Sequence, residues 1–147
     1  MEQQEHYRRL ENMYQAAPIN EYYKPTMEVR DSEATISITV REDMFHAAGA
    51  AHGSVYFKLL DDAAFFAANS LELECFTVTN SFTTYLTKPI GVGKLTAEGK
   101  VVSKNNSQWI AEAVLFNEKG QEVGRGNGIF VKAGMKLKDA AGYSDDL

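Results

Sequence analysis

Several residue types that define particular protein classes are scarce in this chain of 147 residues. Its single cysteine, Cys75, excludes an intrachain disulfide, and no apolar run approaches the roughly 20 residues of a membrane-spanning helix. Basic residues are outnumbered, because 15 Lys and Arg are set against 20 Asp and Glu for a net charge of -5. This balance offers no general attraction for nucleic acid or for an anionic membrane surface. We therefore expect neither as a partner.

The motifs of several enzyme classes are also missing. The sequence has no G-x-S-x-G nucleophile elbow and no Walker phosphate loop. Its opening residues, MEQQEHYRRLENMY, are too polar for the apolar core of a secretory signal. With one cysteine and no such signal, we expect a reducing, cytoplasmic location.

What the chain does contain is an unusual segment, residues 45–70, with the sequence FHAAGAAHGSVYFKLLDDAAFFAANS. A loop of small residues leads into a helix, expected over residues 54–70, that is apolar on nearly every side. Two adjacent carboxylates, Asp61 and Asp62, lie within it, and a buried carboxylate without a partner has a raised pKa or destabilises the fold. Lys58 lies one turn before Asp62 and can pair with it. Asp61 has no such partner on the helix, so it is the candidate functional carboxylate.

The rest of the chain has the patterns of one short helix and several strands. Apolar residues at helical spacing over residues 4–16 predict an amphipathic helix that ends at the loop around Pro18 and Asn20. Alternating and β-branched patterns predict strands at residues 26–40 with a turn at Asp31 and Ser32, and at 76–87, 94–103, 108–116 and 123–132. The short connections among the later strands predict an antiparallel meander.

These elements predict a single α+β domain in which a curved antiparallel sheet wraps around the long helix. We divide the chain into an N-terminal helix and lead-in at residues 1–25, the main domain at 26–132, and a C-terminal tail at 133–147 that lacks periodicity and is expected to fray. Because one sheet face cannot cover a helix that is apolar on nearly every side, we expect a second copy of the chain to close the remainder. The glycines of residues 124–128 share one sheet face and predict either close helix packing or a slot for an extended ligand.

The order of these features resembles the hotdog-fold acyl-CoA thioesterases of the phenylacetate-degradation type. Their pattern is N-x-x-G-x-x-H-G-G, then a helix bearing L-x-D, then a strand closing on Y-[LM]-x-P; this chain has HAAGAAHGS, LLD and YLTKP in that order. The resemblance covers roughly residues 26–132. It implies a hotdog fold and a thioester hydrolase that acts on a small-molecule acyl-CoA, with no metal and no cofactor beyond the CoA of the substrate.

The resemblance also implies roles for four residues. Asp61 falls on the family's helical aspartate and is expected to act as general base or nucleophile. Gly53 falls on the glycine whose backbone N–H polarises the thioester carbonyl. His46 replaces an asparagine that is a second donor to the carbonyl oxygen, and an imidazole N–H can also donate. Thr79 falls on a hydroxyl residue that positions water in some members.

Two further residues of the small-residue loop, His52 and Ser54, are assigned to substrate binding. Ser54 replaces the second glycine of the family pattern, and His52 is expected to shape the loop by hydrogen bonding. His46 and His52 are six residues apart, which is not the spacing of a helical metal pair, and no carboxylate completes a zinc signature. The residues available to meet the CoA phosphates are Lys88, Lys94, Lys104, Arg125 and Lys132.

Gly53 and Asp61 are separated along the expected helix by about 12 Å, too far for one chain to bring both groups to a single reacting centre easily. In the hotdog enzymes that the chain resembles, two subunits place these helices side by side and each site takes its aspartate from the opposite subunit. We therefore expect a homodimer, and the sequence leaves open whether dimers pair into a homotetramer. Two alternatives to a thioesterase also stay open: a hotdog hydratase or dehydratase acting through His46, and a non-catalytic acyl-CoA-binding protein.

Overall fold

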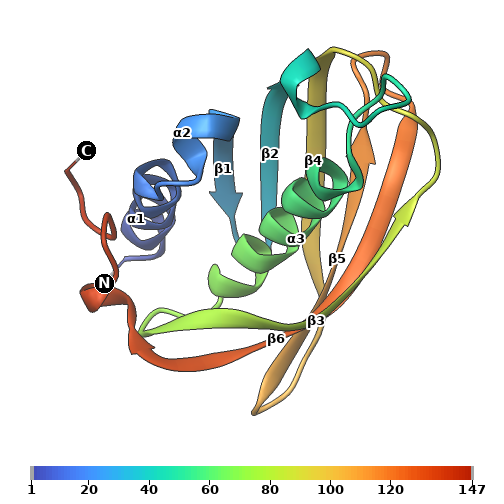
Figure 1. Ribbon diagram of the computed structural model, residues 1–147. Helices are drawn as coiled ribbons and strands as arrows, with labels where there is room; N and C mark the ends of the chain where they lie inside the picture. The colour runs from blue at the N-terminus through green and yellow to red at the C-terminus, as the bar shows by residue number, and fades with distance from the viewer. Residues whose placement is uncertain (1, 147) are drawn as a thin grey trace.

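The computed structural model describes residues 2–146 as a six-stranded antiparallel sheet curved around one long helix (Figure 1). The helices are α1 (Gln3–Ala16), α2 (Asn20–Tyr23) and α3 (Gly53–Asn69), with short 3-10 turns at Glu42–Met44 and Leu137–Asp139. The strands are β1 (Thr26–Arg30), β2 (Glu33–Val40), β3 (Cys75–Leu86), β4 (Gly93–Lys104), β5 (Gln108–Phe116) and β6 (Glu122–Lys136). The expected α+β fold, with its long helix inside a curved sheet, is confirmed.

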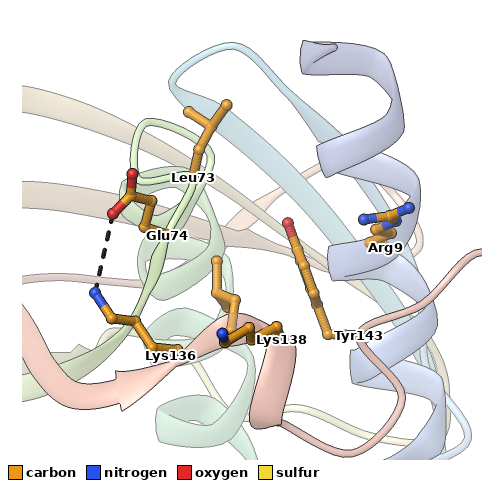
Figure 2. Close-up of a pocket in the computed structure, with 7 residues that line it drawn as sticks. Arg9, Leu73, Glu74, Lys136, Lys138 and Tyr143 are labelled. Carbon is orange, nitrogen blue, oxygen red and sulfur yellow. Dashed lines mark ion pairs between the residues drawn. The ribbon is translucent and has the colours of Figure 1, made fainter. Parts of the chain in front are cut away.

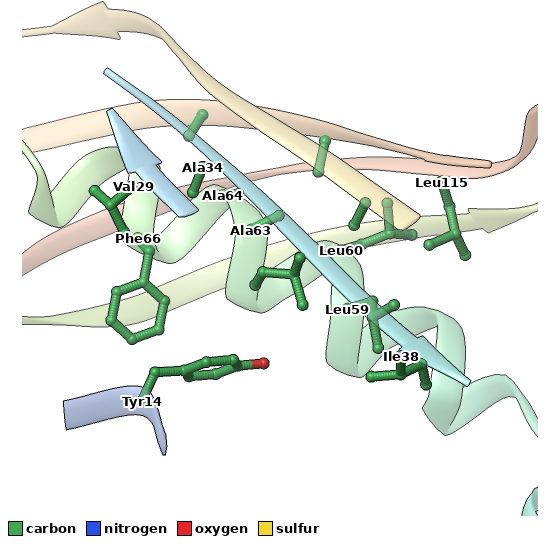
Figure 3. Close-up of a cluster of buried hydrophobic side chains, with 14 of the residues drawn as sticks. Tyr14, Val29, Ala34, Ile38, Leu59, Leu60, Ala63, Ala64, Phe66 and Leu115 are labelled. Carbon is green, nitrogen blue, oxygen red and sulfur yellow. The ribbon is translucent and has the colours of Figure 1, made fainter. Parts of the chain in front are cut away.

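The long helix α3 forms the centre of the core because its apolar side chains extend around most of its circumference. Leu59, Leu60, Ala63 and Ala64 have no exposed surface, and they face side chains of the surrounding strands (Figure 3). The strand β4 comes closest to the helix at Gly99, where a Cβ atom would overlap the backbone of Ala63. None of the helices within residues 2–146 has the length and apolarity needed to cross a membrane.

The expected meander is correct for β4, β5 and β6 and wrong for β3. The sheet order is β1-β2-β4-β5-β6-β3, so β3 pairs with β6 and occupies an edge. The connection from β3 to β4 crosses near the start of α3, where the Ala51 N–H donates to Ile90 O at 2.9 Å and the Tyr56 hydroxyl donates to Lys88 O at 2.6 Å. A short connection indicates that two strands are close in sequence, but it does not reveal that the chain crosses a buried helix between them.

The glycines of β6 make room for neighbouring side chains. A Cβ at Gly126 or Gly128 would collide with the ring of Phe82 from β3, and one at Gly124 would lie 3.3 Å from the Tyr56 ring of α3. Close helix packing is therefore confirmed at Gly124, whereas the ligand slot is wrong for Gly126 and Gly128 because an aromatic ring fills it.

The expectation that the C-terminal tail frays is also wrong for residues 133–143, and Leu147 lies outside the described residues. The strand β6 continues to Lys136, and Leu137 and Tyr143 are buried. The Tyr143 hydroxyl donates to Nδ1 of the fully buried His6 at 2.6 Å, while His6 Nε2 donates to Asn69 O at 2.8 Å. These contacts hold the tail against α1 and the end of α3, and burial lowers the pKa of His6, which favours the neutral ring. Two isolated apolar residues carry no periodic signal, so the sequence pattern did not reveal this packing.

The approach of β4 to α3 predicts that Gly99→Ala destabilises the protein by at least about 2 kcal/mol, because the new methyl group overlaps the helix backbone. Gly134→Ala in β6 is the matched control, since a Cβ there meets nothing within 4 Å, and its effect should stay within about 0.5 kcal/mol. Urea unfolding of both variants measures the difference. Equal stabilities would show that β4 and α3 are not packed in this way.

Candidate active site

The loop before α3 is folded back on itself and delivers Gly53 to the first position of the helix. Phe45 and Ala51 form an isolated antiparallel bridge, and the His46 N–H donates to Ala50 O at 2.9 Å. The His52 N–H then donates to Met44 O at 2.9 Å. Gly49 suits the turn of this loop because its φ of 81° lies in the left-handed region that favours glycine.

The helix start is capped by the imidazole of His52. Its Nδ1 atom accepts from the backbone N–H of Ser54 at 3.0 Å and from the Ser54 hydroxyl at 2.9 Å. The expected loop-shaping role of His52 is therefore confirmed, and Ser54 completes the same cap. Within residues 2–146 the Gly53 N–H has no hydrogen-bond acceptor. It is an unpaired donor at the positive end of a long helix, which favours negative charge nearby.

His46 makes no hydrogen bond with Gly53 among the described residues. Its side chain is exposed, and its Nδ1 accepts from the Ala48 N–H at 3.1 Å. Among the described residues, no contact joins the His46 ring to Gly53 or to Asp61. Its role as a second donor to a carbonyl oxygen stays a prediction.

Asp61 and Thr79 are brought together by α3 and β3 of the same chain. The Thr79 hydroxyl donates to Asp61 Oδ1 at 2.9 Å. The pKa of Asp61 is raised to about 6: burial is the largest cause, the Thr79 hydrogen bond opposes it, the charge of Asp62 adds to it, and the charge of Lys58 opposes it. A carboxylate with such a pKa can exchange a proton near neutral pH. The resemblance implied a role in the site for each of these two residues, but it did not predict the hydrogen bond between them.

Asp62 has a different environment although it is the next residue. Its Oδ2 atom lies 2.6 Å from Lys58 Nζ and accepts from the Tyr14 hydroxyl at 2.7 Å. The expected pairing with Lys58 is confirmed. The contact from Tyr14 was missed, because Tyr14 looked only like part of the apolar stripe of α1. Burial and the Asp62 carboxylate raise the pKa of Tyr14 well above its usual value, so the hydroxyl stays a donor.

A cavity of about 250 Å³ lies beside the two aspartates. It is lined by Met13, Tyr14, Ala17, Ile19, Asn20, Lys58, Asp61, Asp62, Phe65, Phe66, Phe76 and Thr79. The cavity therefore combines the Asp61–Thr79 pair with aromatic rings from α3 and β3 and with residues of the N-terminal segment. Of the residues predicted for the site, it contains Asp61 and Thr79 and not Gly53, His46, His52 or Ser54.

A second cavity, of about 350 Å³, lies between α1 and the end of β6 (Figure 2). Its lining contains none of the predicted site residues. Arg9 there pairs with Asp145 at 2.8 Å, and Lys136 lies 3.9 Å from Glu74. Across residues 2–146, no group of three or more His, Cys, Asp or Glu side chains is arranged to hold a metal ion. The cavity beside Asp61 is therefore the better candidate for chemistry.

The raised pKa of Asp61 predicts a pH-dependent cost to stability. Its pKa in the folded chain, about 6, exceeds the ordinary value of 3.8, so ionisation favours unfolding. The cost is absent below about pH 4 and grows as the pH rises through about 6. Asp61→Asn should therefore raise the free energy of unfolding by about 1 to 2 kcal/mol near pH 8 and leave it unchanged near pH 4.

Denaturant unfolding at both pH values tests this prediction, and Asp62→Asn is the matched control. That variant should be destabilised near pH 8, because it leaves Lys58 and the Tyr14 hydroxyl without their charged partner. If the difference in free energy of unfolding between Asp61→Asn and the parent is the same at both pH values, the raised pKa of Asp61 is contradicted.

Comparisons with known proteins identify the fold and the superfamily. The model of the Thioesterase superfamily matches residues 48–124, slightly more than half of the chain. A search of curated proteins found none that matches this chain. The Escherichia coli PaaI protein from the phenylacetic acid degradation operon is similar in structure, with a TM-score of 0.80, 20% identity, and coverage of 89% of this chain and 97% of that one. A point mutant of the phenylacetic acid degradation protein PaaI from Thermus thermophilus has a TM-score of 0.72, 23% identity, and coverage of 79% and 99%. The alignment with S. sahachiroi AziG has a TM-score of 0.73, 25% identity, and coverage of 79% and 96%. The chain thus has the hotdog fold of the PaaI-like proteins and belongs to the Thioesterase superfamily.

Proposed function

We propose that the protein is an acyl-CoA thioesterase that hydrolyses an acyl- or aryl-CoA to the free acid and CoA. One observation carries the proposal: a buried carboxylate, Asp61, with a pKa of about 6 and a hydrogen bond from Thr79, lines a largely apolar cavity in a chain of the Thioesterase superfamily. A titratable group whose pKa is shifted by burial in a cavity is typical of a catalytic site.

In the proposed reaction, the thioester carbonyl oxygen lies against the Gly53 N–H, where the helix start stabilises the developing negative charge. Asp61 acts either as general base toward water or as the nucleophile, in which case it forms an acyl anhydride that water then hydrolyses, and the Thr79 hydroxyl orients the carboxylate or the water. The thiol of CoA leaves with a proton. No metal or further cofactor is needed for this chemistry.

Gly53 and Asp61 are too far apart on α3 to meet in one chain, since eight residues of helix span about 12 Å. The edge strand β3 is a suitable surface for a second copy, because within residues 2–146 one of its two edges pairs with no other strand. Its exposed apolar side chains include Val78, Tyr85 and Leu86. We propose that two copies associate at this edge, so that Asp61 of one subunit and Gly53 of the other share a site.

Two of the five basic residues considered for the CoA phosphates are suitably placed and lack a described ion pair. Lys88 follows β3 and its carbonyl accepts from the Tyr56 hydroxyl of α3, close to Gly53. Lys94 is the second residue of β4, on the other side of the same connection. By contrast, Arg125 pairs with Glu122 and Lys132 with Glu72. We propose Lys88 and Lys94 as the phosphate-binding residues.

The proposed chemistry predicts that Asp61→Asn lowers the rate of thiol release from acyl-CoA by at least about 100-fold, because the amide neither accepts a proton nor attacks. In the parent protein kcat/KM should rise with pH through about 6 as Asp61 ionises. Thr79→Val should move that inflection to higher pH, because it removes a hydrogen bond that lowers the pKa.

Thr39→Val, at an exposed position of β2, is the matched control and should leave the pH profile unchanged. The substrates are short, medium, long and aryl acyl-CoAs, with an enoyl-CoA included. An Asp61→Asn protein as fast as the parent would contradict the assignment of Asp61. Addition of water to the enoyl-CoA without thiol release would instead favour the hydratase.

A shared site predicts complementation between two inactive variants. Gly53→Pro removes the N–H but suits the first helical position, because His52 already has ψ 148, as a residue before proline prefers. After unfolding and refolding of an equal mixture of Gly53→Pro and Asp61→Asn chains, half of the dimers are mixed and each mixed dimer has one intact site. Thiol release should recover to about a quarter of the parental rate. No recovery, with mixed dimers demonstrated by mass spectrometry, would place both groups of a site in one chain.

A further inference from the structure

The cavity beside Asp61 has a wall that the catalytic elements do not supply. Five of its twelve lining residues belong to residues 13–20, which comprise the end of α1, its connection to α2 and the first residue of α2. The remaining residues come from α3 and β3. The shape of the cavity therefore depends on a segment that precedes the region matched by the superfamily model.

The composition of the cavity changes along α3. Asp61 and Thr79 form its polar part, and Phe65 lies one helical turn beyond Asp61, about 6 Å along the axis. The Phe65 ring packs against Phe76 of β3 with centroids 5.5 Å apart. A substrate with its reacting carbon at Asp61 would thus direct an apolar group toward the phenyl rings.

The N-terminal wall is held in place by contacts to the same helix. The Tyr14 hydroxyl donates to Asp62 Oδ2 at 2.7 Å, and its ring packs edge-on against Phe66 at 5.0 Å (Figure 3). Lys58 Nζ lies 5.0 Å from the Tyr14 ring centroid, within reach of a cation–π contact. The Asn20 side chain in turn donates to Tyr14 O at 2.7 Å. These contacts fix the distance between the wall and α3.

We propose that this cavity binds the acyl group of the substrate and that residues 13–20 set the size of acyl group that fits. The proposal rests on the thioesterase function proposed above. For scale, a cavity of about 150 Å³ lined by apolar side chains accommodates benzene. At about 250 Å³, this one has room for a ring with a short linker or for an aliphatic chain of similar volume. Tyr14, anchored on Asp62, acts as the positioning residue of the wall.

Ala17→Phe tests the wall directly, because Ala17 lines the cavity and a phenyl side chain there would occupy it. We expect kcat/KM for hexanoyl-CoA and benzoyl-CoA to fall by about tenfold or more, while acetyl-CoA changes by less than about twofold. Ala141→Phe is the matched control, since Ala141 is exposed in the C-terminal tail and does not line the cavity. It should leave the whole profile unchanged.

Phe76→Ala should have the opposite effect, because it enlarges the far end of the cavity. We expect its preference to move from hexanoyl-CoA toward decanoyl-CoA, with thermal unfolding used to verify that the variant is folded. Tyr14→Phe keeps the ring and removes only the hydrogen bond to Asp62. It should reduce the selectivity between hexanoyl-CoA and decanoyl-CoA several-fold, mainly through KM.

Calorimetric binding of S-hexyl-CoA and S-decyl-CoA, thioethers that cannot be hydrolysed, separates this proposal from the proposed activity. Weaker binding of S-hexyl-CoA to Ala17→Phe than to Ala141→Phe supports the cavity even if no acyl-CoA is hydrolysed, which would disprove only the activity. If acyl-CoA is hydrolysed but Ala17→Phe and Ala141→Phe have the same size profile and the same thioether affinities, the acyl group binds elsewhere and the proposal is wrong.

Discussion

The structure depends on how one buried helix accommodates two adjacent carboxylates. Helix α3 is enclosed by the sheet, so each charge must find a partner or remain energetically costly. Asp62 receives a cation from Lys58 and a hydroxyl from Tyr14, whereas Asp61 receives only the Thr79 hydroxyl. Asp62 therefore stabilises the packing, whereas Asp61 has a pKa of about 6.

Much of this contrast could be predicted from the sequence, because it depends on local spacing. Lys58 and Asp62 are one helical turn apart, which identified Asp61 as the unpaired carboxylate before any tertiary contact was known. The strands and the long helix were predicted to within a few residues for the same reason. The position of β3 at the sheet edge was not predictable in this way, because hydrophobic periodicity specifies that a strand exists and not which strand it pairs with.

The parts of the candidate site that the sequence patterns did not reveal are contacts between distant segments. Tyr14 and Asp62 are 48 residues apart in the chain, and either residue alone has an ordinary explanation as a core side chain or a helix surface charge. The role of Thr79 likewise could not be predicted from the sequence pattern and was identified only through the resemblance. The tail residue Tyr143 reaches His6 across 137 residues. In each case a single polar contact decides the arrangement, and single contacts leave no periodic signal.

The Asp62–Tyr14 contact also joins the two functional properties proposed for the protein. The charge of Asp62 raises the pKa of Asp61, and Lys58 opposes it. The same charge holds the Tyr14 hydroxyl and, through Tyr14 O, the Asn20 side chain of the cavity wall. A change that weakens the hold on Tyr14 must therefore act on the cavity wall and, through Asp62, on the field around Asp61. The reactivity of Asp61 and the selectivity of the cavity are consequently coupled through Asp62.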